Sequence, residues 1–394
     1  MADPWLRLIG IGEDGLAGLS IASREALANA DIVFGGERHL ELAEVGARGR
    51  RWPVPFSVAP VLACRGQRVA VLASGDPFWY GAGGSLAARL EPGEWVAFPQ
   101  PSTFSLAAAR LGWRLEDAAC IGLHAAPFET LIPHLTAGRR VIALVRDGAA
   151  VPALADWLAR RGFGATQLRV MEALGGPRER TRNGQADRFD LEETIAPVAV
   201  AFVAAGGPGI ANVPGLPNEA FAHDGQITKR PVRAITLSAL APRSEELLWD
   251  IGAGSGSISV EWCLAGGRAI AIEARADRVQ NIRANSAAFG LEKRITVAEG
   301  RAPEALAALP APAAIFVGGG CDASLLAVVW DLMPPRARLV VNAVTLETEA
   351  LLVRWHETHG GELLRMALSQ AAPLGSSRGW VPSRPVVQWS AVKC

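Results

Sequence analysis

The hydrophobic residues in the first half of the chain gather in short runs bounded by glycine, proline or polar residues. Four runs, at 6–10, 69–73, 141–145 and 198–204, have the length and the apolar content of buried strands. Segments with helical spacing lie between them. Strands that alternate with helices in this way predict a parallel α/β architecture for this half.

The second half repeats this alternation more regularly. Helical segments separate five further apolar runs, at 246–251, 269–273, 295–299, 313–317 and 338–343. Five strands in series with helices between them predict a doubly wound, Rossmann-like sheet. The runs at 363–368 and 385–392 are separated by a Gly/Ser/Pro-rich stretch instead, which predicts an antiparallel hairpin at the edge of that sheet.

A change of composition divides the two halves. Residues 206–217 read GGPGIANVPGLP, and so many glycines and prolines predict an irregular linker. The chain has 394 residues, and one hydrophobic core rarely serves more than roughly 250–300. We therefore predict a first domain over 1–205, a linker over 206–217 and a second domain over 218–394.

Composition and charge narrow the classes of function. Lys plus Arg and Asp plus Glu number 39 each, so the net charge of zero offers nucleic acid no attractive field. No apolar run approaches the ~20 residues that span a bilayer, and the N-terminus lacks the pattern of a secretory signal. We expect a cytoplasmic homo-oligomer with a small-molecule substrate and neither nucleic acid nor membrane as partner.

The sequence offers little support for a metal site or for disulfides. The five cysteines form no C-x-x-C pair and are odd in number, which predicts reduced thiols. His356 and His359 have helical ligand spacing, but they lie beside Glu357 in a polar stretch, and we interpret them as a solvated helix end. We therefore predict no metal ion.

The segment LLWDIGAGSGSISVEWC carries the sharpest motif. A predicted strand leads into Gly252, Gly254 and Gly256, and an amphipathic segment follows. Glycines suit a chain that turns sharply from strand to helix while a ligand lies against its backbone. Dinucleotide binding wants a third glycine where this chain has Ser257, so the spacing favours S-adenosylmethionine over the rival reading, an NAD-dependent dehydrogenase.

Two later strand ends fall in register with this loop. Glu273 ends the next predicted strand, where a carboxylate is placed to accept hydrogen bonds from both ribose hydroxyls. The end of the third strand contains Gly300 and Ala302, whose small size leaves room for an adenine ring. The alternative for Glu273 is a solvated acid at a strand end.

The first half has its own glycine loops after strands. LIGIGEDG places Gly10 and Gly12 after the first predicted strand, and a second strand leads directly into the turn Ser-Gly-Asp-Pro at 74–77. By chemistry alone each is a turn with an exposed acid. Asp76 is then open to a simpler interpretation, as the N-cap of the following helix.

Four segments of the second half, DGQITKRPVRAITLSAL, WDIGAGSGSISVE, AEGRAPEAL and IFVGGG, occur in an order that resembles the C-terminal domain of decarboxylating precorrin-6Y C5,15-methyltransferases. The resemblance implies an S-adenosylmethionine site. Its contacts carry over to Thr228, Gly252, Ala253, Gly254, Ser255, Gly256, Glu273 and Ala302. The alternative for Thr228 is the N-cap of the next helix.

The first half, with PQPSTFSLAAARLGW, GGERHL and GLHAAP added to its two loops, resembles the tetrapyrrole methylase family. That family folds as two α/β lobes with the cofactor in the cleft between them. The implied cofactor residues are Gly10, Gly12, Ser74, Gly75, Asp76, Pro77, Ser102 and Thr103. The chain departs from the usual G-x-G-P-G-D at Glu13 and Asp14, which puts cofactor contact at that loop in doubt.

The sequence identifies the residues that would bind the substrate less clearly than those that would bind the cofactor. Gly318, Gly319 and Gly320 end the fourth predicted strand of the second half, where open α/β sheets present ligands, so we expect them to line the substrate pocket; a simple turn is the alternative. Arg230 and Arg233, beside Thr228, are our candidates for binding substrate carboxylates, although surface arginines without function fit equally well. No catalytic acid or base can be assigned from the sequence.

The combined resemblance implies a cobalamin-biosynthesis enzyme with two S-adenosylmethionine sites, one in each domain. It would methylate carbons 5 and 15 of a precorrin-6 intermediate and remove CO₂ from the ring-C acetate to give precorrin-8, with the second domain responsible for carbon 15 and the decarboxylation. One alternative stays open besides the dehydrogenase. The first domain would then be a module that carries intermediates without catalysing a reaction.

Overall fold

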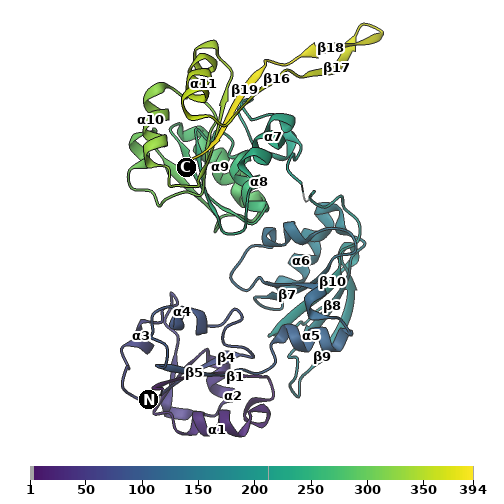
Figure 1. The fold of residues 1–394 in the computed structure, drawn as a ribbon. Coiled ribbons are helices and arrows are strands. Elements are labelled where there is room, and N and C mark those ends of the chain that lie inside the picture. Colours follow the sequence, from purple (N-terminus) through teal and green to yellow (C-terminus); the bar gives the residue numbers. More distant parts are fainter. Residues whose placement is uncertain (1–3, 212, 394) are drawn as a thin grey trace. The chain divides into compact units, whose positions relative to one another are not determined.

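The computed structural model describes residues 4–211 and 213–393 (Figure 1). The contacts between Cα atoms divide the chain into two compact units. The first unit comprises residues 1–128 and 134–209, and the second comprises 129–133 and 210–394. The division falls inside the predicted linker, of which residue 212 lies outside the described residues, as does Cys394.

The first lobe of the first unit is a sheet of five parallel strands in the order β3-β2-β4-β1-β5. The strands are β1 Leu6–Ile11, β2 Ile32–Gly35, β3 Gly49–Arg51, β4 Val69–Ser74 and β5 Trp95–Phe98. The helices between them are α1 Ile21–Ala28, α2 Glu37–Leu42, α3 Ala59–Leu62 and α4 Gly83–Ala87. Alternate side chains of β1 and β4 enter two separate apolar clusters, one on each face, because successive residues of a strand point to opposite sides.

The second lobe differs from the predicted parallel arrangement. Its sheet has the order β6-β7-β10-β8-β9, and only β6 and β7 pair in parallel. The strands are β6 Ala118–Gly122, β7 Arg140–Val145, β8 Gln167–Glu172, β9 Arg180–Gln185 and β10 Val198–Val203, with helices α5 Thr103–Leu111 and α6 Ala150–Leu158. The parallel prediction was wrong here because β8 and β9 were missed: β8 runs in the same direction as β7, whereas β9 and β10 both run opposite to it.

The second unit contains the predicted doubly wound sheet. Its strand order is β13-β12-β11-β14-β15-β19-β16, and the first five of these are parallel. These five are β11 Leu247–Ile251, β12 Arg268–Glu273, β13 Ile295–Glu299, β14 Ala314–Val317 and β15 Arg338–Ala343. The helices are α7 Arg230–Leu240, α8 Ser257–Leu264, α9 Ala276–Ala288, α10 Ala323–Leu332 and α11 Leu346–His359. The order reverses between β11 and β14, so their carboxyl ends form the topological switch point at which such sheets bind ligands.

The edge hairpin is confirmed, with one addition. β16 (Glu362–Met366) and β19 (Val386–Val392) pair antiparallel, and β19 also pairs antiparallel with β15. The stretch between them, expected to be a loop, forms a second antiparallel ribbon of β17 (Ser369–Leu374) and β18 (Ser377–Pro382), which extends away from the sheet (Figure 1). Its side chains are mostly exposed, so the sequence there shows no buried-strand pattern.

None of the helices in residues 4–211 and 213–393 combines the length and the apolar composition needed to cross a bilayer.

Candidate functional site

The glycine loop of the second unit joins β11 to α8 at the switch point. Gly252, Gly254 and Gly256 all have positive φ, at 67°, 60° and 70°. A Cβ on Gly252 would lie 3.0 Å from the carbonyl oxygen of Gly319, and one on Gly256 would lie 3.1 Å from Ile282. At Gly254 a Cβ would meet only two carbonyl oxygens, at 3.9 and 4.0 Å. Two of the glycines thus serve close packing, whereas Gly254 leaves open space beside the loop.

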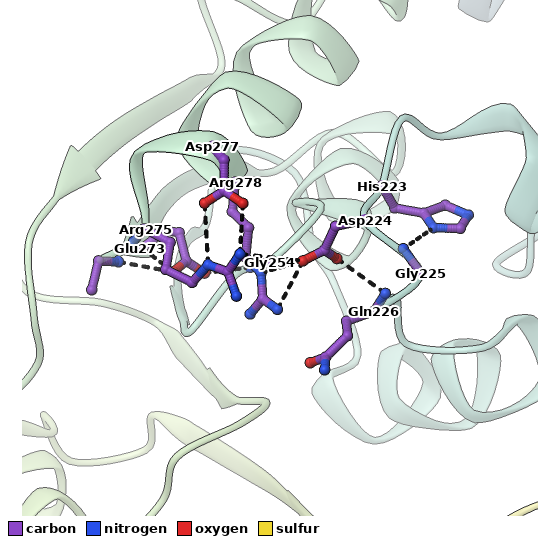
Figure 2. A network of polar contacts seen from close by, with 10 residues as sticks. His223, Asp224, Gly225, Gln226, Gly254, Glu273, Arg275, Asp277 and Arg278 are labelled. Atoms are coloured by element: carbon purple, nitrogen blue, oxygen red, sulfur yellow. Dashed lines mark hydrogen bonds and ion pairs between the residues drawn. The ribbon is translucent and has the colours of Figure 1, made fainter.

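Glu273 ends β12 next to this loop, and its carboxylate is held by backbone N–H groups (Figure 2). The amide of Gly254 donates to one oxygen at 2.9 Å, and the amides of Ala274 and Arg275 donate to the other at 2.9 and 3.0 Å. A carboxylate offers about four acceptor positions, so one remains for a further donor. A ribose that gave both hydroxyls to Glu273 would have to displace the Gly254 amide.

A neighbouring segment is tied to the same region by an ion pair that the sequence reasoning missed. Asp224 accepts from the amide of Gln226 at 3.0 Å and binds the guanidinium of Arg278, on α9, at 2.9 Å (Figure 2). These contacts hold the pKa of Asp224 below its usual value. Because Asp224 lies in the DGQITKR segment that contains Thr228, the ion pair connects that segment to α9 beside Glu273.

Arg233 is placed differently from our expectation. Its side chain is fully buried, and its Nε donates to Glu261, on α8, at 2.6 Å. Its remaining donors bind the carbonyl oxygens of Thr228, at 2.5 Å, and of Leu216, and the amide oxygen of Asn218 at 3.4 Å. A guanidinium engaged in this way has no face left for a substrate carboxylate, so the substrate contact expected of Arg233 was wrong.

The other predicted residues of the second unit lie around the loop. Thr228 is half-buried, and the N-cap position of α7 is taken by Lys229, not by Thr228. Arg230 is exposed at the start of α7. Gly318 donates its amide to Ile251 at 3.1 Å, which brings the glycines after β14 against the loop after β11. Ala302 is half-buried and packs on the core next to β13.

Asp250, the acid inside the glycine motif, is fully buried. One of its oxygens accepts from the amide and the hydroxyl of Ser259, at 3.1 and 2.6 Å, while Oδ1 is buried and finds no hydrogen-bond partner among residues 4–211 and 213–393. Burial, and to a smaller degree the charge of Glu273, raises the pKa of Asp250 to about 6. In the sequence, nothing distinguishes this acid except its place in the glycine motif.

The predicted cofactor segments of the first unit converge. A Cβ on Gly10 would lie 1.7 Å from the carbonyl oxygen of Gly75, and one on Gly75 would lie 2.6 Å from the Cα of Ser102. The amide of Gln100 donates to that same carbonyl of Gly75 at 3.0 Å. The loop after β1, the turn after β4 and the start of α5 are therefore packed backbone against backbone, which only glycine permits at these two positions.

Several of their side chains are engaged locally. Asp76 accepts from the amide of Phe78 at 2.8 Å within its own turn, and it does not cap α4, which begins at Gly83. Ser102 is the N-cap of α5, where its hydroxyl accepts from the amide of Ser105 at 3.1 Å. Thr103 is the first residue of that helix, and Pro77 is buried in the turn. A cofactor contact by Ser102 would have to use its backbone.

The residues that break the usual loop pattern form a charged cluster. Glu13 is nearly buried and pairs with Arg38, on α2, and with Arg178, 3.7 Å away. The three side chains line a cavity of about 520 Å³ together with Asp14. Glu13 therefore faces two arginines, which accounts for an acid in the first loop without a contact to cofactor.

Comparison with known proteins matches both units. A family model described as "Tetrapyrrole (Corrin/Porphyrin) Methylases" matches residues 6–190, and one described as "Precorrin methyltransferase domain" matches residues 219–393. A Sinorhizobium relative named precorrin-6Y C(5,15)-methyltransferase [decarboxylating] is 46% identical and covers 100% of this chain and 97% of its own. The chain belongs to the precorrin-6Y C(5,15)-methyltransferase family.

A second member of the precorrin-6Y C(5,15)-methyltransferase family, from Mycobacterium tuberculosis, is 39% identical over 98% of this chain and 99% of its own. The crystal structure of the C-terminal domain of the Rhodobacter capsulatus enzyme is 59% identical, covers 47% of this chain and all of its own, and has a TM-score of 0.46. The two full-length relatives and the two family models confirm the resemblance drawn from the motifs. Membership of the family implies S-adenosylmethionine as methyl donor.

Two cysteines and a histidine of the second unit are buried or packed against aromatic rings. Cys263 and Cys321 are buried and free, and burial raises the pKa of each thiol to about 12. His359 packs its ring against Trp330 and Trp355, with centroids 4.4 and 4.7 Å apart. In the described part of the chain, no three His, Cys, Asp or Glu side chains come close enough together to hold a metal ion.

Proposed function

We propose that this member of the family has two independent S-adenosylmethionine sites, one in each unit. The first unit would methylate carbon 5 of a precorrin-6 substrate, and the second would methylate carbon 15 and release CO₂ from the ring-C acetate, giving precorrin-8. The observation that carries the proposal is the presence of two unlike glycine-loop arrangements in one chain. Each is at the carboxyl edge of its own parallel sheet.

The second site is supported by the fit of its residues to a nucleoside. The open side of Gly254 offers space next to the loop, and Glu273 has an acceptor position left. Gly319 and Gly320, exposed after β14, lie at the same switch point, where the reacting carbon of a large substrate would approach. Arg230 is the remaining candidate for a substrate carboxylate, because it is exposed beside Thr228.

The first site is supported by the convergence of its three segments. Gly10, Gly12 and the turn 74–77 bring backbone groups together at the ends of β1 and β4, next to the start of α5. A cofactor there would meet main-chain amides and carbonyls, since several side chains of these segments are bound locally. The cytoplasmic location and the homo-oligomeric state stay predictions.

The chemistry asks mainly for positioning. A reduced tetrapyrrole offers electron-rich, enamine-like ring carbons, and S-adenosylmethionine supplies the methyl group to such a carbon held in line with the methyl–sulfur bond. Loss of CO₂ from an acetate arm leaves an electron pair, which an adjacent iminium of the macrocycle accepts. The chain's residues therefore have to bind, align and exclude water.

The proposal is tested with variants of the full chain that damage one site at a time. With a precorrin-6 substrate, Asp76→Ala should stop at a product with one added methyl group and one lost CO₂, since the 74–77 turn serves only the first site. Gly254→Arg should block decarboxylation, because its side chain would fill the space beside the loop. Mass spectrometry of the products distinguishes these outcomes.

Each variant has a matched control. Asp147 also caps a turn in the first unit, through the amide of Ala150 at 3.0 Å, so Asp147→Ala tests for general damage to that unit. Gly360 has a positive φ of 67° and open surroundings in the second unit, so Gly360→Arg tests the effect of a bulky residue at such a position. If Asp76→Ala still yields the doubly methylated product at the normal rate, the first site is misplaced.

A further inference from the structure

His39 and Ser74 of the first unit form a hydrogen-bonded pair, and of the two only Ser74 belongs to the segments proposed to hold the cofactor. His39, on α2, has its Nε2 2.8 Å from the hydroxyl oxygen of Ser74. Ser74 is the last residue of β4 and pairs in register with Ile11, one residue before Gly12. Its exposed hydroxyl therefore lies at the carboxyl edge of the sheet, between two of the segments proposed to hold the cofactor.

The surroundings of His39 keep its ring neutral. Arg38 places Nη2 3.0 Å from Nε2 of His39 and 2.9 Å from the hydroxyl of Ser74. Burial, and then the charge of Arg38, lowers the pKa of His39 to about 4. The guanidinium of Arg38 is itself paired with Glu13 from the loop after β1, and Arg178 from the second lobe lies on the far side of Glu13.

The other charges on α2 do not change the neutral state of the His39 ring. Glu37 pairs with Arg51, on β3. His39 Nδ1 is buried and makes no hydrogen bond within the described residues. A histidine that served only packing would normally have both ring nitrogens bonded, and a buried polar atom without a partner calls for an explanation. The unpaired nitrogen and the contact to an exposed hydroxyl suit a ring that changes its proton content during turnover.

The methylation proposed for the first unit releases a proton from carbon 5. The inference concerns this proton and therefore rests on the proposed function. Carbon 5 carries one hydrogen before methylation, and its electron pair forms the new C–C bond while the methyl–sulfur pair stays on sulfur. The ring is then an iminium cation, and carbon 5 bears both the methyl group and the hydrogen. Loss of that hydrogen as a proton returns the C–H electron pair to the ring and restores conjugation.

We propose that Ser74 and His39 remove this proton. The Ser74 oxygen takes the proton from carbon 5 while its own proton passes to Nε2 of His39, which becomes an imidazolium and later releases the proton to water. Ser74 is the catalytic residue, because it faces the reacting carbon, and His39 is a positioning residue that acts through Ser74. A weak base suffices, since the hydrogen next to an iminium is strongly acidic.

The test uses the full chain, a precorrin-6 substrate and S-adenosylmethionine. His39→Gln keeps a hydrogen-bonding group beside Ser74 but cannot take up a proton, so the rate constant for methylation at carbon 5 should fall about 10²- to 10⁴-fold, the range of general-base catalysis. Ser74→Ala should have a similar effect. Ser85→Ala, at an exposed serine on α4 of the same lobe, should keep the wild-type rate.

Two readouts separate proton removal from mere support of the fold. Equilibrium binding of S-adenosylmethionine to the first site should be unchanged in His39→Gln, and deuterium at carbon 5 of the substrate should slow product formation more in this variant than in the wild type. In the substrate-free protein, the ring nitrogens of His39 should report a neutral imidazole at pH 6 by NMR, with shifts that change in Ser74→Ala.

Wild-type methylation at carbon 5 by His39→Gln would overturn the inference, as would a loss of rate matched by an equal loss of cofactor binding. The result for Asp76→Ala distinguishes a failure of this inference from a failure of the proposed function. If Asp76→Ala blocks methylation at carbon 5 and His39→Gln does not, only the role of the pair is wrong; if Asp76→Ala blocks nothing, the proposed first site fails.

Discussion

At the scale of single residues, the sequence was most informative where backbone conformation dictates the residue type. The glycines at 252, 254 and 256 all have positive φ, a region that few other residues adopt, so their spacing predicts the loop reliably. Arg233 and His39 could not be assigned in this way. Whether an arginine is buried against Glu261, or a histidine lies beside Ser74, depends on contacts between residues far apart in the chain.

Glu273 gives the prediction at this scale. In Glu273→Gln, one oxygen is replaced by an NH₂ group that cannot accept a hydrogen bond from the amides or hydroxyls it faces, so binding of S-adenosylmethionine to the second site should weaken by about 1–3 kcal/mol. The expected observation is a Michaelis constant for S-adenosylmethionine that is roughly 5- to 150-fold higher in the decarboxylation assay.

Glu299 provides the control. It ends the neighbouring strand β13, directly opposite Glu273 in the register, and it is exposed. Glu299→Gln should therefore leave the constant near that of the wild type. An unchanged constant in Glu273→Gln would remove Glu273 from the cofactor site.

At the scale of secondary-structure elements, the buried pair between α7 and α8 matters most for the second site. Glu261 of α8 accepts from Arg233 of α7 and from the amides of Gly215 and Leu216, at 2.5 and 3.0 Å. Arg233 in turn binds the carbonyl of Thr228. The helix that begins at the glycine loop is thereby joined to the segment that carries a proposed cofactor residue.

Removal of one member of this pair should be costly. Arg233→Met leaves the Glu261 carboxylate buried with less compensation, which typically lowers the free energy of unfolding by ~3–5 kcal/mol. Amide hydrogen exchange measured on peptides of α7 and α8 should become faster, by the factor that corresponds to this loss in the free energy of unfolding.

Arg230→Met, one turn earlier on the same helix and exposed, should change exchange little, because surface substitutions usually cost below about 0.5 kcal/mol. Equal protection in Arg233→Met and the wild type would show that the guanidinium does not stabilise the two helices.

The elements also show how far sequence patterns reach. The five parallel strands of the second unit were predicted within a residue or so; the four inner strands are buried on both faces and read as continuous apolar runs, whereas β13 lies at the edge and is only partly buried. Strands such as β9 and β17 are largely exposed and lack this signal, so they were missed. The direction of β10 follows from its antiparallel pairing with β7 and β8, and pairing order is a property of the whole sheet.

At the scale of the whole molecule, the segment that joins the two units is hydrogen-bonded to each unit at its two ends. A short stretch of chain lies between these two bonded ends. Thr166 accepts from the amide of Ala205 at 3.0 Å in the first unit, and Glu261 holds Gly215 in the second. Val213, between these anchors, is 70% exposed. The predicted linker over 206–217 therefore contains an exposed residue, while its last residues are bound to α8.

Limited proteolysis should find this interval first. Thermolysin, which cuts before apolar residues, should cleave next to Ile210 or Val213, because an exposed Gly/Pro-rich segment presents its backbone to a protease. Mass spectrometry of the early fragments identifies the cut. Val213→Asp should slow it, whereas first cuts in the exposed β17–β18 ribbon, near Leu374 or Val381, would contradict the prediction.

The hold of Glu261 on Gly215 and Leu216 has a consequence for dividing the gene. A second unit expressed alone from a start codon after Leu216 would lose the two amides that neutralise a buried carboxylate, and the α7–α8 pair would be left with an acid short of donors. A viable split must therefore fall upstream of the Gly215 codon. Recombination between homologous genes preserves function only where few contacts are severed. A crossover that exchanges the second unit should therefore also fall upstream of the Gly215 codon.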